Sequence, residues 1–243
     1  GRGNHLTAVG NPTVISGGLN GKNVIDFDGA VDYLYRTSTL NGLPAGSQDR
    51  TMVALVNYRG VGYGGVSYGD ASCNHAFGLG VDSQGRMGVE NWCNFTGTTQ
   101  NVVGAGWILQ TAVLSGNQVK HYRNADQVGI FSRTFDTYQT RLLLGANLDT
   151  VRKMNMQIAA MYIYDRPLSA SELTALRQYI QQTYSVNVGG GNNIAPLAQN
   201  DTANVQQGAS ATIDVLANDS DSDGTLVASS VSIVSQPLQG SVS

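Results

Sequence analysis

The sequence predicts an antiparallel β-sandwich closed by one C-terminal helix, with an incomplete all-β unit after it. Short apolar segments recur along residues 1–165, turns rich in Gly, Asn and Ser separate them, and no helical pattern lies between them. The chain contains 30 Gly, and only 13% of its residues are charged. This composition suits short strands joined by tight turns. The length of 243 residues allows one domain plus a fraction, or two small ones.

Six apolar segments are predicted to be strands, at 24–27, 51–56, 112–114, 119–122, 141–144 and 158–164. The second of these, TMVALV, is too apolar to face water on either side. Residues 77–81 and 87–89 alternate between apolar and small or polar side chains around the turn DSQG. We therefore expect a β-hairpin about this turn.

Two cysteines flank the predicted hairpin, Cys73 and Cys93. Folding the hairpin about its turn places them directly opposite each other or offset by about two residues. Cross-strand neighbours are close enough for a disulfide, which would indicate an oxidising compartment. Two buried free thiols are the alternative.

One helix is predicted over residues 169–183. Ser169 is its expected N-cap, and Glu172 stands at the third helical position, which together form a capping box. Apolar residues then follow at helical spacing, at Leu173, Leu176, Ile180 and Tyr184. We expect this helix to pack on the sandwich.

The domain boundaries follow a change in composition. Residues 1–186 are assigned to the sandwich, 187–196 to a Gly/Asn-rich linker, and 197–243 to a partial all-β unit with strands at 211–216 and 230–234. The first residue is not Met, so we expect an excised or processed piece of a longer multidomain chain.

The charge argues against nucleic acid as a partner, and the hydropathy argues against a transmembrane helix. With 14 Lys+Arg against 17 Asp+Glu, the net charge is -3, and there is no basic stripe for nucleic acid. No apolar run approaches the length that a transmembrane helix needs.

Three motifs resemble a known family. Residues 27–34 (FDGAVDYL) are similar to the strand-turn motif of bacterial laminin-G-like, concanavalin A-like domains. Residues 158–169 (IAAMYIYDRPLS), with Glu172 and Leu173, resemble the closing motif of these domains, and residues 119–124 (VKHYRN) resemble an intervening hairpin. The resemblance implies a jelly-roll sandwich.

The C-terminal unit resembles the start of cadherin-like, immunoglobulin-like repeats of large bacterial proteins. The matching pieces are residues 193–196 (NIAP), 213–219 (IDVLAND) and 221–224 (DSDG). This resemblance implies a modular bacterial protein that is secreted or displayed at the cell surface.

The sequence carries little that favours catalysis. Residues 65–69 fit the G-x-S-x-G pattern, but no helix follows as a nucleophile elbow requires. The chain has only two glutamates, Glu90 and Glu172, whereas glycoside hydrolysis needs two carboxyl groups close together. For a polysaccharide lyase, Tyr68, His75 and Arg59 are the available residues, and no ordered motif joins them.

Ligand-binding residues are predicted around Trp92. Strand alternation places Glu90 and Trp92 on the more exposed face of their strand. A Trp beside carboxylate and amide groups suits a sugar, since the ring stacks on its apolar face and polar groups bind its hydroxyls. We expect a site formed by Trp92, Glu90, Asn91 and Asn94, with Tyr68 as a weaker member. Packing of Trp92 on a neighbouring loop is the alternative.

Calcium is a candidate cofactor. Asp219, Asp221 and Asp223 begin a D-x-D-x-D-G pattern, but the twelfth loop position is Ser230 rather than Glu. Closely spaced carboxylates bind Ca²⁺ if another loop completes the shell, and a solvated acidic turn is the alternative. Asp70 and Asn74 are weaker candidate oxygen ligands.

These observations favour a non-catalytic module that binds a polysaccharide or cell-surface glycan. An adhesion or spacer domain without sugar affinity is one alternative. A polysaccharide lyase or glycosidase on a concanavalin A-like fold is the other.

Overall fold

The computed structural model describes residues 3–189, 197–220, 226, 228 and 231–242. The chain divides into two compact units, Gly1–Gly191 and Asn192–Ser243. The division falls within the predicted linker, 187–196. In the described part of the chain, no helix is long and apolar enough to cross a membrane.

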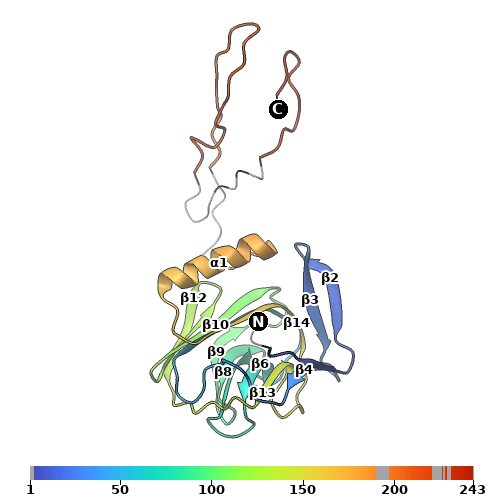
Figure 1. Ribbon diagram of the computed structural model, residues 1–243, viewed down its shortest axis with the longest axis vertical. Helices are drawn as coiled ribbons and strands as arrows, with labels where there is room; N and C mark the ends of the chain where they lie inside the picture. Colours follow the sequence, from blue (N-terminus) through green and yellow to red (C-terminus); the bar gives the residue numbers. More distant parts are fainter. Residues whose placement is uncertain (1–2, 190–196, 221–225, 227, 229–230, 243) are drawn as a thin grey trace. The chain divides into compact units, whose positions relative to one another are not determined.

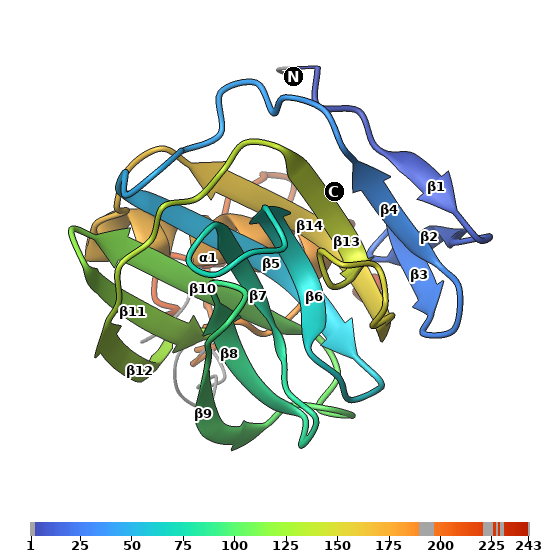
Figure 2. The ribbon, with the colours of Figure 1, turned by 90° about the horizontal axis from the view of Figure 1, so that it is seen from below.

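The first unit is a sandwich of two antiparallel seven-stranded sheets (Figures 1 and 2). The first sheet has, in spatial order, β1 (Thr7–Val9), β4 (Tyr33–Arg36), β13 (Arg141–Ala146), β6 (Gly64–Gly69), β7 (Ala76–Val81), β8 (Arg86–Glu90) and β9 (Phe95–Asn101). The second has β12 (Asp126–Ser132), β11 (Gln118–Arg123), β10 (Ile108–Ser115), β5 (Arg50–Tyr58), β14 (Asn155–Tyr164), β3 (Lys22–Asp28) and β2 (Thr13–Leu19). All six predicted strands and both strands of the predicted hairpin form, which confirms the predicted fold class.

Strand β5 is buried on both faces because the sheet lies between the core and the helix. Met52, Ala54 and Val56 belong to the cluster between the two sheets. Val53 and Leu55 point the other way and pack with residues of the helix. This explains why the segment contains no alternation between apolar and polar residues.

The helix α1 (Ala170–Tyr184) covers the outer face of the second sheet, behind β5 and β10 in Figure 2. Leu173 and Ile180 are its buried residues, as the helical spacing predicts. Leu176 and Tyr184 pack beside them at partial exposure. The helix thereby closes the side of the sandwich away from β7 and β8.

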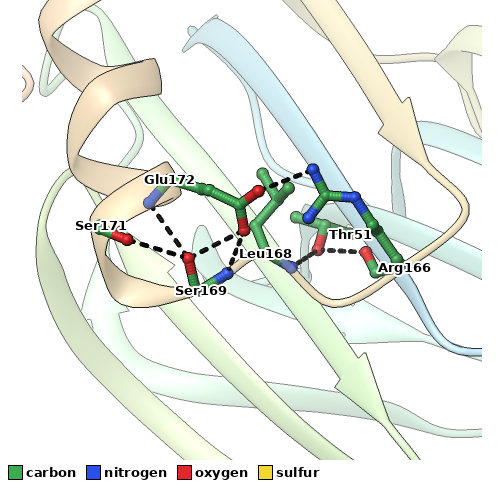
Figure 3. A network of polar contacts seen from close by, with 6 residues as sticks. All are labelled: Thr51, Arg166, Leu168, Ser169, Ser171 and Glu172. Atoms are coloured by element: carbon green, nitrogen blue, oxygen red, sulfur yellow. Dashed lines mark hydrogen bonds and ion pairs between the residues drawn. The ribbon is translucent and has the colours of Figure 1, made fainter.

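The predicted capping box is present at the start of α1 (Figure 3). The Ser169 hydroxyl accepts a hydrogen bond from the Glu172 amide, and the Ser169 amide donates to the Glu172 carboxylate at 2.8 Å. The Arg166 guanidinium forms an ion pair with the same carboxylate at 2.7 Å. The Thr51 hydroxyl donates to the Arg166 carbonyl and accepts from the Leu168 amide, which attaches the turn to β5.

The Cys73–Cys93 disulfide forms, as predicted. The β7–β8 register pairs Gly78 with Glu90 and Val81 with Met87. Extended beyond the strands, this register offsets the cysteines by two residues from direct opposition. The bridge therefore links the segment before β7 to the turn after β8.

The second unit forms no strand among its described residues, and its only pairing there is an isolated bridge between Leu197 and Ser220. The strand predicted at 211–216 does not form. A second strand was predicted at 230–234, and its described residues, 231–234, are not in a strand either. Ile213 and Ile233 are 47% and 49% exposed. Among the described residues of this unit, these segments have no partner strands to cover their apolar side chains.

Candidate functional site

A pocket of about 540 Å³ opens on the outer face of the first sheet, over β8 and β9. Three of its lining residues are aromatic: Tyr63, Trp92 and Phe95. Four are charged: Asp82, Arg86, Glu90 and Arg152. The others are Cys93, Asn94, Gly97 and Asn147. Strands β8 and β9 supply the floor, and four loops supply the walls.

Strand alternation determines which side chains of β8 reach the pocket. Met87 and Val89 point between the sheets and belong to the core. Arg86 and Glu90 therefore point to the outer face. Glu90 is only 5% exposed, so its carboxyl group forms part of the pocket floor.

Glu90 is a buried acid without an ion-pair partner among the described residues. Burial raises the pKa of Glu90 to about 7, because water no longer solvates its charged form. The positive charge of Arg152 acts against this rise, the negative charge of Asp149 adds to it, and Ser67 also lowers the pKa. Near neutral pH, the pocket therefore contains a carboxyl group in both protonation states.

Asp82 is the second carboxylate of the pocket, and its hydrogen-bonding capacity is already used. One oxygen accepts from the amides of Gln84 and Arg86, at 2.8 and 2.9 Å. The other accepts from the Arg86 guanidinium at 2.8 and 2.7 Å. The charges of Asp82 and Arg86 consequently offset each other.

The aromatic side chains form one wall. The rings of Tyr63 and Phe95 meet edge to face at 5.6 Å between centroids, a favourable arrangement. The Arg152 guanidinium lies 5.4 Å from the Tyr63 ring centroid. Phe95 lies directly over Gly88, where a Cβ would come within 2.3 Å of the ring. Glycine at this position leaves the space that the ring occupies.

Trp92 lies at partial exposure and contributes to both the pocket and a small cluster beneath it. Its backbone has a φ of 81°, which is rare for a bulky residue. Asn91 and the Cys73–Cys93 bridge adjoin it on either side and hold this conformation. The backbone strain is thus located at a residue that lines the pocket, as is common at binding sites.

The structure brings together three of the five predicted ligand residues: Trp92, Glu90 and Asn94. Asn91 is fully buried instead. Its side chain donates to Asn74 at 2.8 Å and accepts from the Asn94 amide at 3.2 Å. Asn91 therefore positions the turn that carries Trp92 and does not itself face the pocket.

The prediction that Tyr68 contributes to a ligand site is wrong. Tyr68 is fully buried in the core, where its hydroxyl accepts from Arg50 at 2.7 Å and donates to the Pro44 carbonyl at 3.0 Å. Residues 64–69 form β6, and the alternation of this strand turns Val66 and Tyr68 inward. The same burial removes Tyr68 from any lyase site with His75 and Arg59.

His75, named from the sequence as an available residue for a lyase, has three neighbouring partners in the structure. Its Nδ1 lies 2.7 Å from the Ser72 hydroxyl, its Nε2 lies 3.3 Å from Asp136, and its ring stacks on Tyr138. The Ser72 hydroxyl donates its proton to Asp70 at 3.0 Å. His75 therefore connects Ser72, Asp136 and Tyr138 and braces the loop before β7.

The calcium prediction remains a prediction. Asp221 and Asp223 lie outside the described residues, and one oxygen of Asp219 accepts from the Gln199 amide at 2.7 Å. Among the described residues, no group of three or more acidic, His or Cys side chains is arranged to hold a metal ion. Asp70 contacts Ser72 and Arg141, and the side-chain oxygen of Asn74 accepts from Asn91.

Sequence reasoning missed four side chains of the pocket that matter most for its chemistry: Tyr63, Phe95, Arg86 and Arg152. Phe95 and Arg86 could have been predicted as pocket residues, because they adjoin the predicted hairpin. Tyr63 and Arg152 are 89 positions apart and meet only because the β13–β14 loop folds over the start of β6. No local signal reports that contact.

The model of the concanavalin A-like lectin/glucanases superfamily matches residues 28–174. The chain belongs to this superfamily. The model of the bacterial Ig domain matches residues 192–243, in agreement with the second resemblance. None of the curated proteins compared with the chain matches it.

Solved structures share the sandwich. Domain 4 of AbnA, a GH43 extracellular arabinanase from Geobacillus stearothermophilus, in complex with arabinotriose, is 16% identical with a TM-score of 0.54; the match covers 69% of this chain and 82% of that one. A GH54 α-L-arabinofuranosidase is 13% identical with a TM-score of 0.58, covering 76% and 49%. The binding domain of Paraclostridial Mosquitocidal Protein 1 is 12% identical with a TM-score of 0.54, covering 72% and 47%. At these identities the similarity shows the fold alone.

Proposed function

We propose that the sandwich is a non-catalytic glycan-binding module and that the pocket over β8 and β9 is its binding site. One observation carries the proposal: a partly exposed Trp92 and the carboxyl group of Glu90, which forms no ion pair within hydrogen-bond distance among the described residues, line the same pocket. Sugars combine an apolar ring face with hydroxyl groups. An aromatic ring and a hydrogen-bonding carboxyl group satisfy both requirements.

The carboxyl groups of the pocket favour binding over hydrolysis. A glycosidase needs one carboxyl group as acid and a second as base or nucleophile. Both oxygens of Asp82 are already engaged by Arg86 and by two backbone amides. Glu90 is left to accept hydrogen bonds from sugar hydroxyls, or to donate one when it is protonated.

The similarity to domain 4 of the arabinanase is consistent with this proposal, since that domain is described in complex with arabinotriose. The sugar bound here is a separate question, given the low identity. We further propose that the chain belongs to a secreted or surface-displayed bacterial protein. The disulfide favours an oxidising compartment, and the bacterial Ig match favours a modular architecture.

A glycan array tests the proposal, using the parent chain and Trp92→Ala. Tyr179→Ala is the matched control, because Tyr179 is an exposed aromatic residue on α1, across the sandwich from the pocket. We expect the parent and the control to bind the same glycans. Trp92→Ala should lose at least about tenfold in affinity, the loss typical of a central Trp.

Two results would contradict the proposal. The first is a Trp92→Ala variant that is folded and binds as tightly as the parent. The second is an array without any binding, which would favour the adhesion or spacer alternative. Incubation with each bound polysaccharide, followed by detection of released sugars, separates binding from cleavage.

A further inference from the structure

We propose that this pocket selects acidic glycans, with the Arg152 guanidinium binding a uronate carboxylate. The inference rests on the proposed function and specifies its ligand class. It follows from three features of the pocket: a guanidinium that forms no ion pair in the described part of the chain, a balanced Asp82–Arg86 ion pair, and an acid on the floor that is not fully charged at neutral pH.

The Arg152 guanidinium is held by an aromatic ring and not by an ion pair. Its guanidinium lies over the Tyr63 ring at 5.4 Å, a contact that leaves the N–H groups free. In the described part of the chain, its side chain takes part in no ion pair. Its carbonyl accepts from the Asn147 amide at 2.9 Å, which closes the loop that carries it. A planar guanidinium held in this way is suited to a bidentate bond with a carboxylate.

The other charges of the pocket compensate the positive charge of Arg152 only in part, since Glu90 interacts with it but is not fully ionised near neutral pH. Asp82 and Arg86 form a close ion pair, so their fields largely cancel at the pocket. Glu90 is the remaining acid that lines it, and burial shifts it toward its neutral form. Asp149 is a nearby negative charge that would repel an anionic ligand. It belongs to the β13–β14 loop but lines a different pocket. An anionic ligand therefore meets less repulsion than the count of carboxylates suggests.

The groups that line the pocket are of the kinds that a uronic acid needs. Its carboxylate projects from the ring edge, while one ring face stays apolar. In the proposed complex, the ring face packs on an aromatic side chain of the pocket and the carboxylate binds Arg152. Hydroxyl groups on the opposite edge are directed toward the floor, where Glu90 accepts or donates hydrogen bonds.

The test compares glycans that differ only in the carboxylate. Polygalacturonate, alginate and hyaluronate are each titrated against the chain at low ionic strength, together with their carboxyl-reduced, neutral forms. We expect at least one acidic form to bind about tenfold more tightly than its reduced form. Added NaCl should weaken the acidic form more than the neutral one, because the guanidinium is on the exposed rim.

Variants assign the effect to one residue. Arg152→Gln should abolish the tenfold preference for the acidic form over its reduced form, so that the two forms bind with similar affinity. Lys22→Gln is the control, because it removes the same charge at an exposed position of β3, in the other sheet. Melting curves of both variants establish that they fold.

The outcomes separate the two proposals. If neutral forms bind as tightly as acidic ones, the acidic selectivity is wrong and glycan binding stands. If Arg152→Gln keeps the preference, the role of Arg152 is wrong. If no glycan of either kind binds, both proposals are overturned.

Discussion

The side-chain amide of Asn91 donates a hydrogen bond to the side-chain oxygen of Asn74, 2.8 Å away, across the open end of the β7–β8 hairpin. The Asn74 amide returns a bond to the Asn91 carbonyl at 2.9 Å. The Cys73–Cys93 bridge joins the residue before Asn74 to the residue two positions after Asn91. These three links hold the backbone of Trp92, which lies between Asn91 and Cys93, in its left-handed conformation.

Asn91→Ala should remove the side-chain link and leave the Asn74 side chain without this partner. The loss of a buried hydrogen-bonded amide costs about 1–3 kcal/mol in the free energy of unfolding. Glycan affinity should fall as well, because Trp92 loses its preordered position. Urea unfolding measures the first effect. The control is Asn94→Ala, at an exposed position, which should leave stability within about 0.5 kcal/mol of the parent.

Reduction of the disulfide should lower stability by roughly 3 kcal/mol, the entropy expected for a loop with a sequence separation of 20. Urea unfolding with and without a reductant measures this difference. Thiol titration of the unreduced, denatured chain should find no free cysteine. A free thiol in that sample would show that the bridge does not form in solution.

Ser169→Ala should destabilise the chain by about 1 kcal/mol, since the Glu172 amide loses its acceptor at the start of α1. Ser171→Ala is the matched control. In Figure 3 Ser171 contacts only the Ser169 hydroxyl. A thermal melt compares the two. Equal melting temperatures would mean that another group replaces the cap.

Gly88→Ala should displace Phe95, because the added Cβ would lie 2.3 Å from its ring and 2.7 Å from the Thr96 carbonyl oxygen. We expect a destabilisation of about 1–3 kcal/mol and a loss of glycan affinity. Gly97→Ala provides the comparison, since its Cβ would meet nothing closer than 3.4 Å. If both variants have the melting temperature of the parent, Phe95 is not packed against Gly88 as the structure shows.

Glu90→Gln tests the pH dependence of stability. The pKa of Glu90 is raised in the folded chain, to about 7 from an ordinary value of 4.5. The folded state therefore binds this proton more tightly than the unfolded state. The contribution of Glu90 to stability is complete below pH 4.5 and is lost as the pH rises to about 7. In total it amounts to about 3 kcal/mol.

His121 also contributes to the pH dependence of the stability of the parent chain. Burial lowers the pKa of His121 to about 3, so over pH 3 to 6.5 this residue changes stability in the opposite direction. The informative quantity is the stability of Glu90→Gln minus that of the parent. It should increase from pH 4.5 to 7.5. A constant difference would show that Glu90 has an ordinary pKa.

Local sequence determined the strands, the hairpin and the helix. The apolar run of β5 indicated burial on two faces, and the Ser169–Glu172 spacing identified the first turn of α1. Each of these signals lies within a few residues, because strand alternation, turn formation and capping are short-range. The disulfide followed from hairpin register for the same reason.

The tertiary structure alone decided which side chains share the pocket. The alternation along one strand predicted Trp92 and Glu90 as neighbours in a ligand site, and both line the pocket. Tyr68 was also predicted as a ligand residue, but it is buried because β6 turns that position toward the core. The contact of Arg152 with Tyr63 joins the β13–β14 loop to the segment before β6. Such pairing depends on how two sheets and their loops pack. That packing is set by the whole core and not by any neighbouring stretch of sequence.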